Sequence, residues 1–240
     1  VRVGVKGPND FVTETDQAAE AIIIETLKKA YPDHAILAEE SGASGTSDFE
    51  WVIDPIDGTA NFIHGLPHYA IAIALRVKGQ VQQAVVFNPA TNEMYTASKG
   101  EGAFLNNRRI RVSKRTRPNE FLVGFAFPSG SQEGSTPIKK RMLALTESTA
   151  GIRKSGSAVL DLAYVACGRL DGYLCYGLKP WDLAAGALMV SEAGGIVSDF
   201  KGETGYLQHG DIVAGSPKIF AQMLGVLTPL YKGKQSLAQG

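Results

Sequence analysis

The sequence predicts a mixed α/β fold, with an antiparallel sheet in the middle of the chain and βα units towards its end. One observation behind this is a series of short apolar runs between residues 68 and 125, typical of consecutive strands. Another is the alternation of helical and strand patterns that follows. A length of 240 residues allows one large domain or two packed subdomains with a substantial core.

The first helix is predicted to start at Thr15 or Asp16, either of which can cap it, and to end at Pro32. The segment before it, from Val1 to Asp10, is polar and irregular. Apolar residues recur at helical spacing: Ala19, Ile22, Ile23, Leu27 and Ala30. Two short apolar runs, Ala35 to Ala38 and Trp51 to Ile53, then predict buried strands that lead into acidic residues.

Two strands of the central sheet are predicted at Tyr69 to Val77 and Val81 to Phe87, joined by the hairpin signal Lys78-Gly79-Gln80. The remaining strands of this meander are Glu93 to Ala97, Ala103-Phe104, Ile110 to Val112 and Phe121 to Phe127. In the second half the predicted helices are Ile138 to Leu145, Ser157 to Ala166, Trp181 to Ala193 and Pro217 to Leu227. The predicted strands there are Leu170 to Tyr176, Ile196-Val197 and Ile212 to Ala214.

Composition excludes several classes of partner. The 24 basic and 24 acidic residues balance, so no overall field favours nucleic acid or an anionic membrane. The longest apolar stretches, such as Ala70 to Leu75, are far too short to span a bilayer. The two cysteines, Cys167 and Cys175, lack metal-type spacing and suit a reducing compartment. We therefore expect a cytoplasmic protein with no membrane partner.

Carboxylates gather where predicted strands end or helices begin, at Glu39-Glu40, Asp54, Asp57 and Asp182. An apolar strand leads into Asp54, and we expect Pro55 to end that strand and start a helical turn. Asp57 would then lie one turn beyond Asp54 on the same face. Two carboxylates held so close repel unless a cation lies between them, and Mg²⁺ prefers such oxygen ligands.

Each acid also has an ordinary structural explanation. Asp54 fits a helix N-cap with Asp57 at the third helical position, and Asp182 fits an early-helix acid after Pro180. Glu39-Glu40 fits a solvated loop. Taken singly, these explanations are the more common ones. The joint occurrence of the acids beside strongly apolar segments favours a metal site.

With its neighbours, this acidic pattern resembles the inositol monophosphatase family, especially its bacterial members. The resemblance is carried by the motifs Ala38-Glu39-Glu40-Ser41, Asp54-Pro55-Ile56-Asp57-Gly58-Thr59-Ala60-Asn61-Phe62, and Trp181-Asp182 with Gly194-Gly195. Their order and spacing match, and the nine-residue block is specific. The segment from Asp10 to Asp16 and the loop from Gly151 to Ala158 also resemble family segments, so the resemblance covers nearly the whole chain. Relatives usually carry a helix before the position of Val1.

The resemblance implies hydrolysis of small phosphate monoesters, with inositol 1-phosphate as the leading substrate, by water activated on two to three Mg²⁺ ions. Glu39, Asp54 and the carbonyl of Ile56 would hold the first ion, and Asp54, Asp57 and Asp182 the second. A third, weaker ion would lie near Glu39. Clustered Mg²⁺ neutralises the phosphate dianion and lowers the pKa of the bound water.

The same resemblance implies the catalytic and substrate-binding residues. Thr59, with Asp16 behind it, would orient the attacking water beside Glu39. The amides of Gly58 and Thr59 would hold the phosphate. Substrate contacts are implied at Asp57, Gly58, Thr59, Ala158, Cys175 and Asp182.

The fold implied by the resemblance is the layered αβαβα sandwich of the sugar phosphatases, usually dimeric and lithium-sensitive. We expect a single domain over residues 1–240. Within it, residues 1–125 would form the metal- and phosphate-binding half, residues 126–231 the substrate-side half, and residues 232–240 a polar tail.

Cys175 departs from the family pattern. The inositol-specific relatives have a Glu there that binds ring hydroxyls, whereas a thiol is a poor acceptor without charge at neutral pH. This substitution predicts an altered or broadened substrate range. The alternative is that Cys175 packs as a small apolar residue.

A basic run is the other notable feature, and its members are Arg108, Arg109, Arg111, Lys114, Arg115 and Arg117. Ile110 and Val112 alternate with its arginines, which favours a strand with one solvated face. The alternative is a surface that binds nucleic acid or the transcription machinery, as some bacterial relatives do.

Alternative functions would require different motifs in the sequence. A haloacid-dehalogenase-type phosphatase needs two Asp separated by one residue, whereas Asp54 and Asp57 are separated by two. Enzymes of the same fold acting on fructose 1,6-bisphosphate, adenosine 3′,5′-bisphosphate or histidinol phosphate share these motifs, because the motifs encode the reaction and not the alcohol. A binding protein built on this scaffold remains a third alternative.

Overall fold

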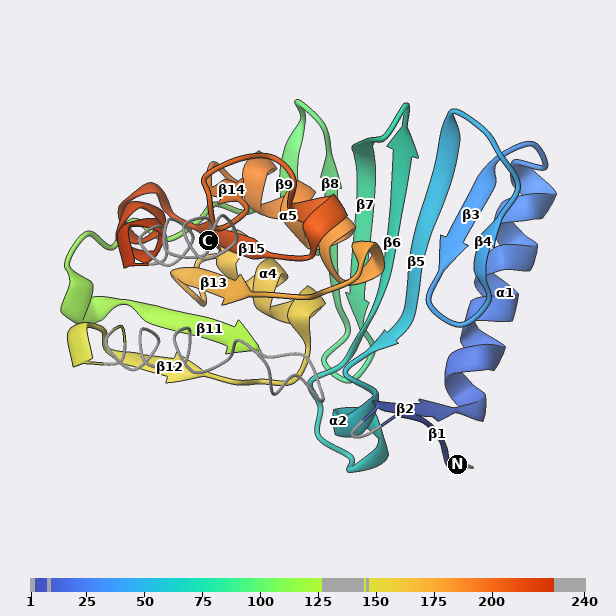
Figure 1. The fold of residues 1–240 in the computed structure, drawn as a ribbon, viewed down its shortest axis with the longest axis horizontal. Helices are drawn as coiled ribbons and strands as arrows, with labels where there is room; N and C mark the ends of the chain where they lie inside the picture. Colours follow the sequence, from blue (N-terminus) through green and yellow to red (C-terminus); the bar gives the residue numbers. More distant parts are fainter. Residues whose placement is uncertain (1–2, 8–9, 127–144, 146, 227–240) are drawn as a thin grey trace, which may run out of the picture.

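The computed structural model describes residues 3–7, 10–126, 145 and 147–226 and shows five alternating layers of helix and sheet (Figure 1). An eight-stranded sheet has α1 (Glu14–Ala30) on one face and α4 (Ala158–Ala166) and α5 (Pro180–Glu192) on the other. A five-stranded sheet covers the far side of these two helices, and helical residues 217–226 pack on its outer face. The predicted αβαβα sandwich is therefore confirmed.

Helix α1 (Glu14–Ala30) begins before the predicted cap at Thr15 or Asp16, because both of these residues already lie in its first turn. The N-cap is Thr13, whose hydroxyl accepts the amides of Thr15 and Asp16 while the Asp16 carboxylate accepts the Thr13 amide. One side of the helix packs onto Ile36, Ala38 and Ile53 of the large sheet. The chain before the helix is not irregular as expected, because β1 (Val3–Gly7) and β2 (Asp10–Thr13) pair as a short antiparallel sheet.

The large sheet has the strand order β10-β9-β8-β7-β6-β5-β3-β4. Its strands are β3 (Ala35–Ala38), β4 (Gly42–Ser44), β5 (Phe49–Asp57), β6 (Ala70–Val77), β7 (Gln80–Asn88), β8 (Glu93–Ser98), β9 (Gly102–Leu105) and β10 (Arg108–Arg109). Only β3 and β5 pair in parallel within it. Lys78 and Gly79 both have positive φ, 50° and 79°, which confirms the predicted tight hairpin between β6 and β7.

Two predictions for the meander are wrong, one about the existence of a strand and one about the sheet that a strand joins. Ile110 to Val112 form no strand, because after β10 the chain leaves the sheet edge and the Val112 amide bonds to the carbonyl of Ala193 at the end of α5. The last strand, β11 (Leu122–Ala126), does not close the large sheet. It pairs in parallel with β12 (Gly151–Arg153) and β13 (Gly172–Cys175) in the second sheet.

The second sheet has the order β12-β11-β13-β15-β14, with β14 (Ile196–Ser198) and β15 (Ile212–Gly215) antiparallel to their neighbours. Short helices α2 (Thr59–Ile63) and α6 (Tyr206–His209) and the 3-10 turn η1 (Pro118–Glu120) complete the described elements. The predicted helix from Ile138, apart from Leu145, and the predicted tail 232–240 lie outside the described residues. None of the described helices is both long and apolar enough to cross a bilayer.

Helices α4 (Ala158–Ala166) and α5 (Pro180–Glu192) form the middle layer, at the positions that the sequence predicts. The largest core cluster joins them to Ala72, Ala74 and Val86 of the large sheet and to Tyr173 and Ala214 of the second. Close approach of the two helices depends on a glycine. A Cβ built on Gly186 of α5 would lie 2.4 Å from the Cβ of Leu162 in α4.

We expect Gly186→Ala to destabilise the protein by about 1–3 kcal/mol, because the added methyl group forces α4 and α5 apart. Urea unfolding at equilibrium measures this difference. Gly225→Ala is the matched control, since a Cβ at this helical glycine meets no atom of the described residues within 4 Å. It should be neutral or stabilising by up to about 1 kcal/mol. Equal stability of the two variants would contradict the packing argument.

Candidate functional site

Three carboxylates from distant parts of the chain meet at one end of the large sheet. One oxygen from each of Asp54, Asp57 and Asp182 lies within 4.8 Å of the others. Asp54 and Asp57 come from the end of β5, and Asp182 from the first turn of α5. A fourth acid, Glu39, follows β3 and shares a hydrogen bond with Asp54. The structure thus brings together every carboxylate that the family resemblance places at the metals.

The local structure that pairs Asp54 with Asp57 differs from the expectation. Pro55 does not end the strand, because β5 continues to Asp57. Asp54 pairs with Ala72 and Asp57 with Ala70, so three steps along β5 match two steps along β6. In a regular strand, residues three apart point to opposite faces. The extra residue of this bulge returns both carboxylates to the same face, and a proline is tolerated at a bulge.

Burial and mutual repulsion make these acids hard to ionise without a cation. The pKa of Asp54 lies well above its usual range because of burial and then the charges of Asp57, Glu39 and Asp182. Burial, with the charge of Asp57, raises the pKa of Asp182 to about 8. Burial also raises the pKa of Asp57 to about 7, although hydrogen bonds from Ser157 and Val159 lower it. A bound cation would remove this penalty.

The donor set fits a hard divalent metal. Asp54 Oδ1 is buried and has no hydrogen-bond partner among the described residues. Asp182 uses Oδ2 to accept the Lys179 amide at 2.7 Å, so it also caps α5, as its ordinary structural explanation requires. Carboxylate oxygens with a nearby backbone carbonyl at Ile56 are the ligands that Mg²⁺ or a similar ion prefers.

Helix α4 supports the cluster from the second half of the chain. Asp57 Oδ2 accepts the Ser157 hydroxyl at 2.5 Å and the Val159 amide at 2.7 Å. Ala158, predicted to contact substrate, is the buried first residue of α4 between these two donors. The N-terminus of α4 therefore fixes one carboxylate of the cluster and places the segment from Gly151 to Ser157 beside it.

Thr59 and Asp16 lie together, as the resemblance implies. The Thr59 hydroxyl is 3.1 Å from Asp16 Oδ1 and 3.1 Å from the Ile56 carbonyl, and its single proton can go to either. Asp16 is fully buried, and its other oxygen accepts the amide and the hydroxyl of Thr13. The roles of Thr59, Asp16 and Glu39 in catalysis stay predictions.

Gly58 joins β5 to α2 in a conformation that other residues rarely adopt. Its φ is +93°, and a Cβ there would lie 3.0 Å from the His68 carbonyl and 3.2 Å from the Gly156 carbonyl. The neighbouring Asn61 donates to the carbonyls of His68 and Ser155 at 2.7 and 2.9 Å. Asn61 thus ties the Gly58 turn to the segment from Gly151 to Ser157.

Sequence reasoning gave no role to Asn61 or Ser157. Asn61 belongs to the nine-residue block, which was the one available signal. Ser157 had only its place beside Ala158, and its contact with Asp57 joins residues that are far apart in the chain.

Cys175 lies in the core. It is fully buried on β13, its thiol donates to the Tyr176 carbonyl at 3.6 Å, and burial raises its pKa to about 12. This placement favours the packing interpretation. An altered substrate range stays a prediction.

All six side chains of the basic run are exposed. Two of them make ion pairs, Arg115 with the buried Asp171 at 3.2 Å and Arg117 with Glu120 at 2.6 Å. Arg109 lies 6.0 Å from the centre of the Phe104 ring. The run is therefore a solvated surface with local partners for some members.

The layered fold and an acidic cluster that could hold a metal ion fit a family of metal-dependent phosphatases. The sequence model of the inositol monophosphatase family matches residues 2–229, and the chain belongs to this family. Its members include metal-dependent phosphatases.

Curated relatives of the chain carry another name. Nus factor SuhB of Escherichia coli K12 is 50% identical over 226 residues, which cover 93% of this chain and 85% of that protein. A putative Nus factor SuhB of Neisseria meningitidis serogroup B is 50% identical over 95% of this chain and 88% of that protein.

Similar solved structures include both a SuhB protein and an inositol monophosphatase. The extragenic suppressor protein SuhB of Bartonella henselae is 41% identical with a TM-score of 0.91, covering 94% of this chain and 88% of its own. An inositol monophosphatase of Anabaena is 36% identical with a TM-score of 0.85, covering 91% and 87%.

The raised pKa values predict how the metal-free protein responds to pH. Unfolded aspartates have a pKa of about 3.9, so between pH 4 and 8 the folded state binds more protons than the unfolded state. The contribution of the protonated acids to the free energy of unfolding is greatest below about pH 4. It should fall as pH rises through the folded-state pKa values of about 7 for Asp57 and about 8 for Asp182.

Thermal melts in a chelator should therefore show Tm decreasing from pH 5 to pH 9. Asp182→Asn should flatten that slope, because the amide cannot ionise, and exposed Asp48→Asn should leave it unchanged. Addition of a divalent cation should raise Tm more at pH 8 than at pH 5. A slope identical in the wild type and Asp182→Asn would contradict this assignment.

Proposed function

We propose that the protein is a Mg²⁺-dependent phosphomonoesterase that hydrolyses small phosphate esters, with inositol 1-phosphate as the leading substrate. The observation that supports this most is the convergence of Asp54, Asp57 and Asp182, which repel one another unless a cation is bound. Membership of the inositol monophosphatase family is consistent with this chemistry.

In this proposal, Glu39, Asp54 and the Ile56 carbonyl hold one ion, Asp54, Asp57 and Asp182 hold a second, and a third weaker ion lies near Glu39. When bound, such ions neutralise the phosphate dianion, acidify a water molecule and stabilise the leaving oxygen. The residues of the chain keep these charges apart and oriented. Ser157 and the Val159 amide do so for Asp57, and the Lys179 amide does so for Asp182.

Thr59 and Asp16 orient the attacking water. When the Thr59 hydroxyl donates to Asp16 at 3.1 Å, its oxygen becomes an acceptor for a hydrogen of that water. Glu39, which shares a hydrogen bond with Asp54, accepts the other hydrogen. Gly58 and Thr59 present the first amides of α2 to the phosphate, and Ala158 and Asp182 lie beside the alcohol.

Asp54→Asn should lower phosphate release by roughly 100-fold or more at saturating substrate, because it removes a carboxylate shared by both proposed ions. The measurement is release of inorganic phosphate from inositol 1-phosphate with and without Mg²⁺. The control is Asp48→Asn, an exposed acid remote from the cluster. Covalent phosphate trapped on Asp54 would instead indicate a nucleophilic aspartate and contradict a metal-activated water.

The alcohol portion of the substrate needs its own test, because the metal site does not select it. A panel of inositol 1-phosphate, fructose 1,6-bisphosphate, adenosine 3′,5′-bisphosphate and histidinol phosphate compares kcat/KM directly. Cys175→Glu should improve the ratio for inositol 1-phosphate if the missing carboxylate limits polyol recognition. An unchanged ratio would support packing as the role of Cys175.

A second role is favoured by the relatives that are 50% identical, which are a Nus factor and a putative Nus factor. We propose a contact with the transcription machinery or its RNA through the exposed basic run. RNA binding through this surface should weaken steeply with salt. Replacing Arg108, Arg109 and Arg111 by Ala should reduce the binding and its salt slope while phosphate release stays unchanged. Equal binding by this variant would remove the proposal.

Quaternary structure, location and inhibition follow the family in this proposal: a cytoplasmic, lithium-sensitive homodimer. Light scattering after size-exclusion chromatography gives the mass in solution. Phosphate release across a lithium titration measures the inhibition.

A further inference from the structure

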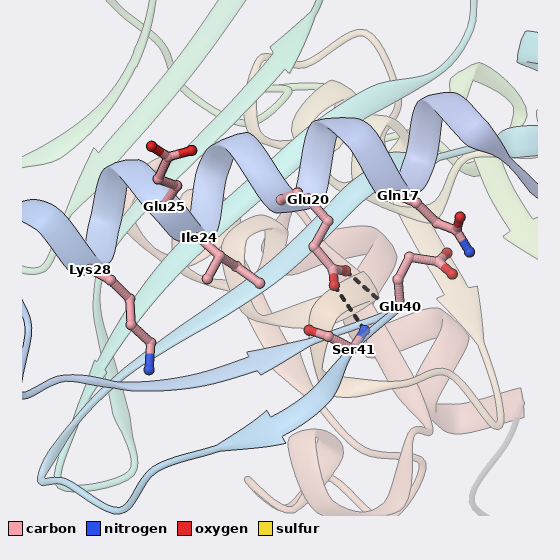
Figure 2. A pocket seen from close by; sticks show the side chains of 8 residues that line it. Gln17, Glu20, Ile24, Glu25, Lys28, Glu40 and Ser41 are labelled. Carbon is pink, nitrogen blue, oxygen red and sulfur yellow. Dashed lines mark hydrogen bonds between the residues drawn. The ribbon is translucent and has the colours of Figure 1, made fainter.

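A buried carboxylate of α1 contacts the turn that carries Glu39 (Figure 2). Glu20 is only 3% exposed, and its two oxygens accept the amides of Glu40 and Ser41, each at 2.8 Å. It lies in a hollow between α1 and this turn, with Gln17, Ile24, Glu25 and Lys28 along the helix side. No role in the proposed reaction has been given to it.

The turn needs such a partner. Residues 39–41 connect β3 to β4, in which Ala38 pairs with Gly42, so the turn lies between the last paired residues of a hairpin. Hydrogen bonds from two successive amides to one ionised carboxylate are charge-assisted and fix the orientation of the turn. Glu39, its first residue, directs its carboxyl group to Asp54.

The same face of α1 also holds Asp16, one of the proposed catalytic residues. Asp16 lies one turn before Glu20 on α1, and its carboxylate accepts the Thr59 hydroxyl. Two buried acids on one helix therefore make both contacts. Asp16 bonds to Thr59 directly, and Glu20 acts on Glu39 through the turn 39–41. Their separation is set by the pitch of the helix.

We infer that Glu20 is a positioning residue, which orients the turn 39–41 so that the Glu39 carboxylate contributes to the metal site. This inference rests on the proposed metal-dependent function. It predicts that loss of the Glu20 charge weakens metal binding. Substrate binding to the metal-loaded enzyme should stay nearly unchanged, because Glu20 bonds to backbone amides of the turn and is not among the proposed substrate contacts.

The test compares Glu20→Gln with Glu25→Gln in the full chain. The Gln keeps the shape but places an amide donor against a backbone amide, whereas Glu25 is exposed on the same helix. Calorimetry with Mn²⁺ measures affinity directly and needs no turnover. We expect roughly tenfold weaker Mn²⁺ binding for Glu20→Gln, as for other residues that orient metal ligands, and no change for Glu25→Gln.

Kinetics provide a second reading. The Mg²⁺ concentration for half-maximal phosphate release should rise by about the same factor, with KM for the ester unchanged at saturating Mg²⁺. Unchanged Mn²⁺ affinity in Glu20→Gln, with a lowered Tm alone, would overturn the inference in favour of a purely structural role.

A fallback variant and two wild-type outcomes show whether the inference, the proposed function or both fail. If Glu20→Gln does not fold, Glu20→Asp keeps the charge but shortens its reach, and should show an intermediate loss of Mn²⁺ affinity. A wild type that binds Mn²⁺ but releases no phosphate would remove the proposed function, and Mn²⁺ affinity would still decide the role of Glu20. A wild type that binds no Mn²⁺ would overturn both.

Discussion

Repulsion among clustered carboxylates is the constraint around which this structure is organised. Oxygens of three aspartates lie within 4.8 Å of one another, and Glu39 shares a hydrogen bond with one of these aspartates. Ionising all of them in a partly buried site costs free energy. The surrounding elements lower that cost with backbone amides and a hydroxyl aimed at individual oxygens. A cation completes the compensation in the active state that we propose.

The layers of the fold each deliver a part of this site. The large sheet contributes the end of β5, and the middle layer contributes the first turns of α4 and α5. The outer helix α1 contributes buried acids that bond to Thr59 and to the turn after β3. Close contact between Gly186 and Leu162 keeps α4 and α5 near enough for their N-termini to approach the same end of the sheet.

Short-range signals in the sequence predicted most elements and the acids of the candidate site. The αβαβα layering followed from resemblance to a known family, which also supported the grouping of the acids that their places beside apolar segments had indicated. What the sequence could not indicate depends on long-range pairing. The continuation of β5 through Pro55 requires the bulge against β6, and β11 joins the second sheet because β12 and β13 provide its partners. Asn61 and Glu20 bond to backbone groups, and because every residue has these groups, the sequence does not indicate which of them are the partners.

The dispersal of the ligands along the chain has a consequence for synthesis of the protein. Glu39, Asp54 and Asp57 are synthesised first, whereas Ser157 of α4 follows 100 residues after Asp57 and Asp182 comes later still. A nascent chain therefore lacks the complete site, and an ion that binds only the finished arrangement stabilises the folded product without trapping intermediates. Metal capture would then mark the end of folding for each newly made molecule.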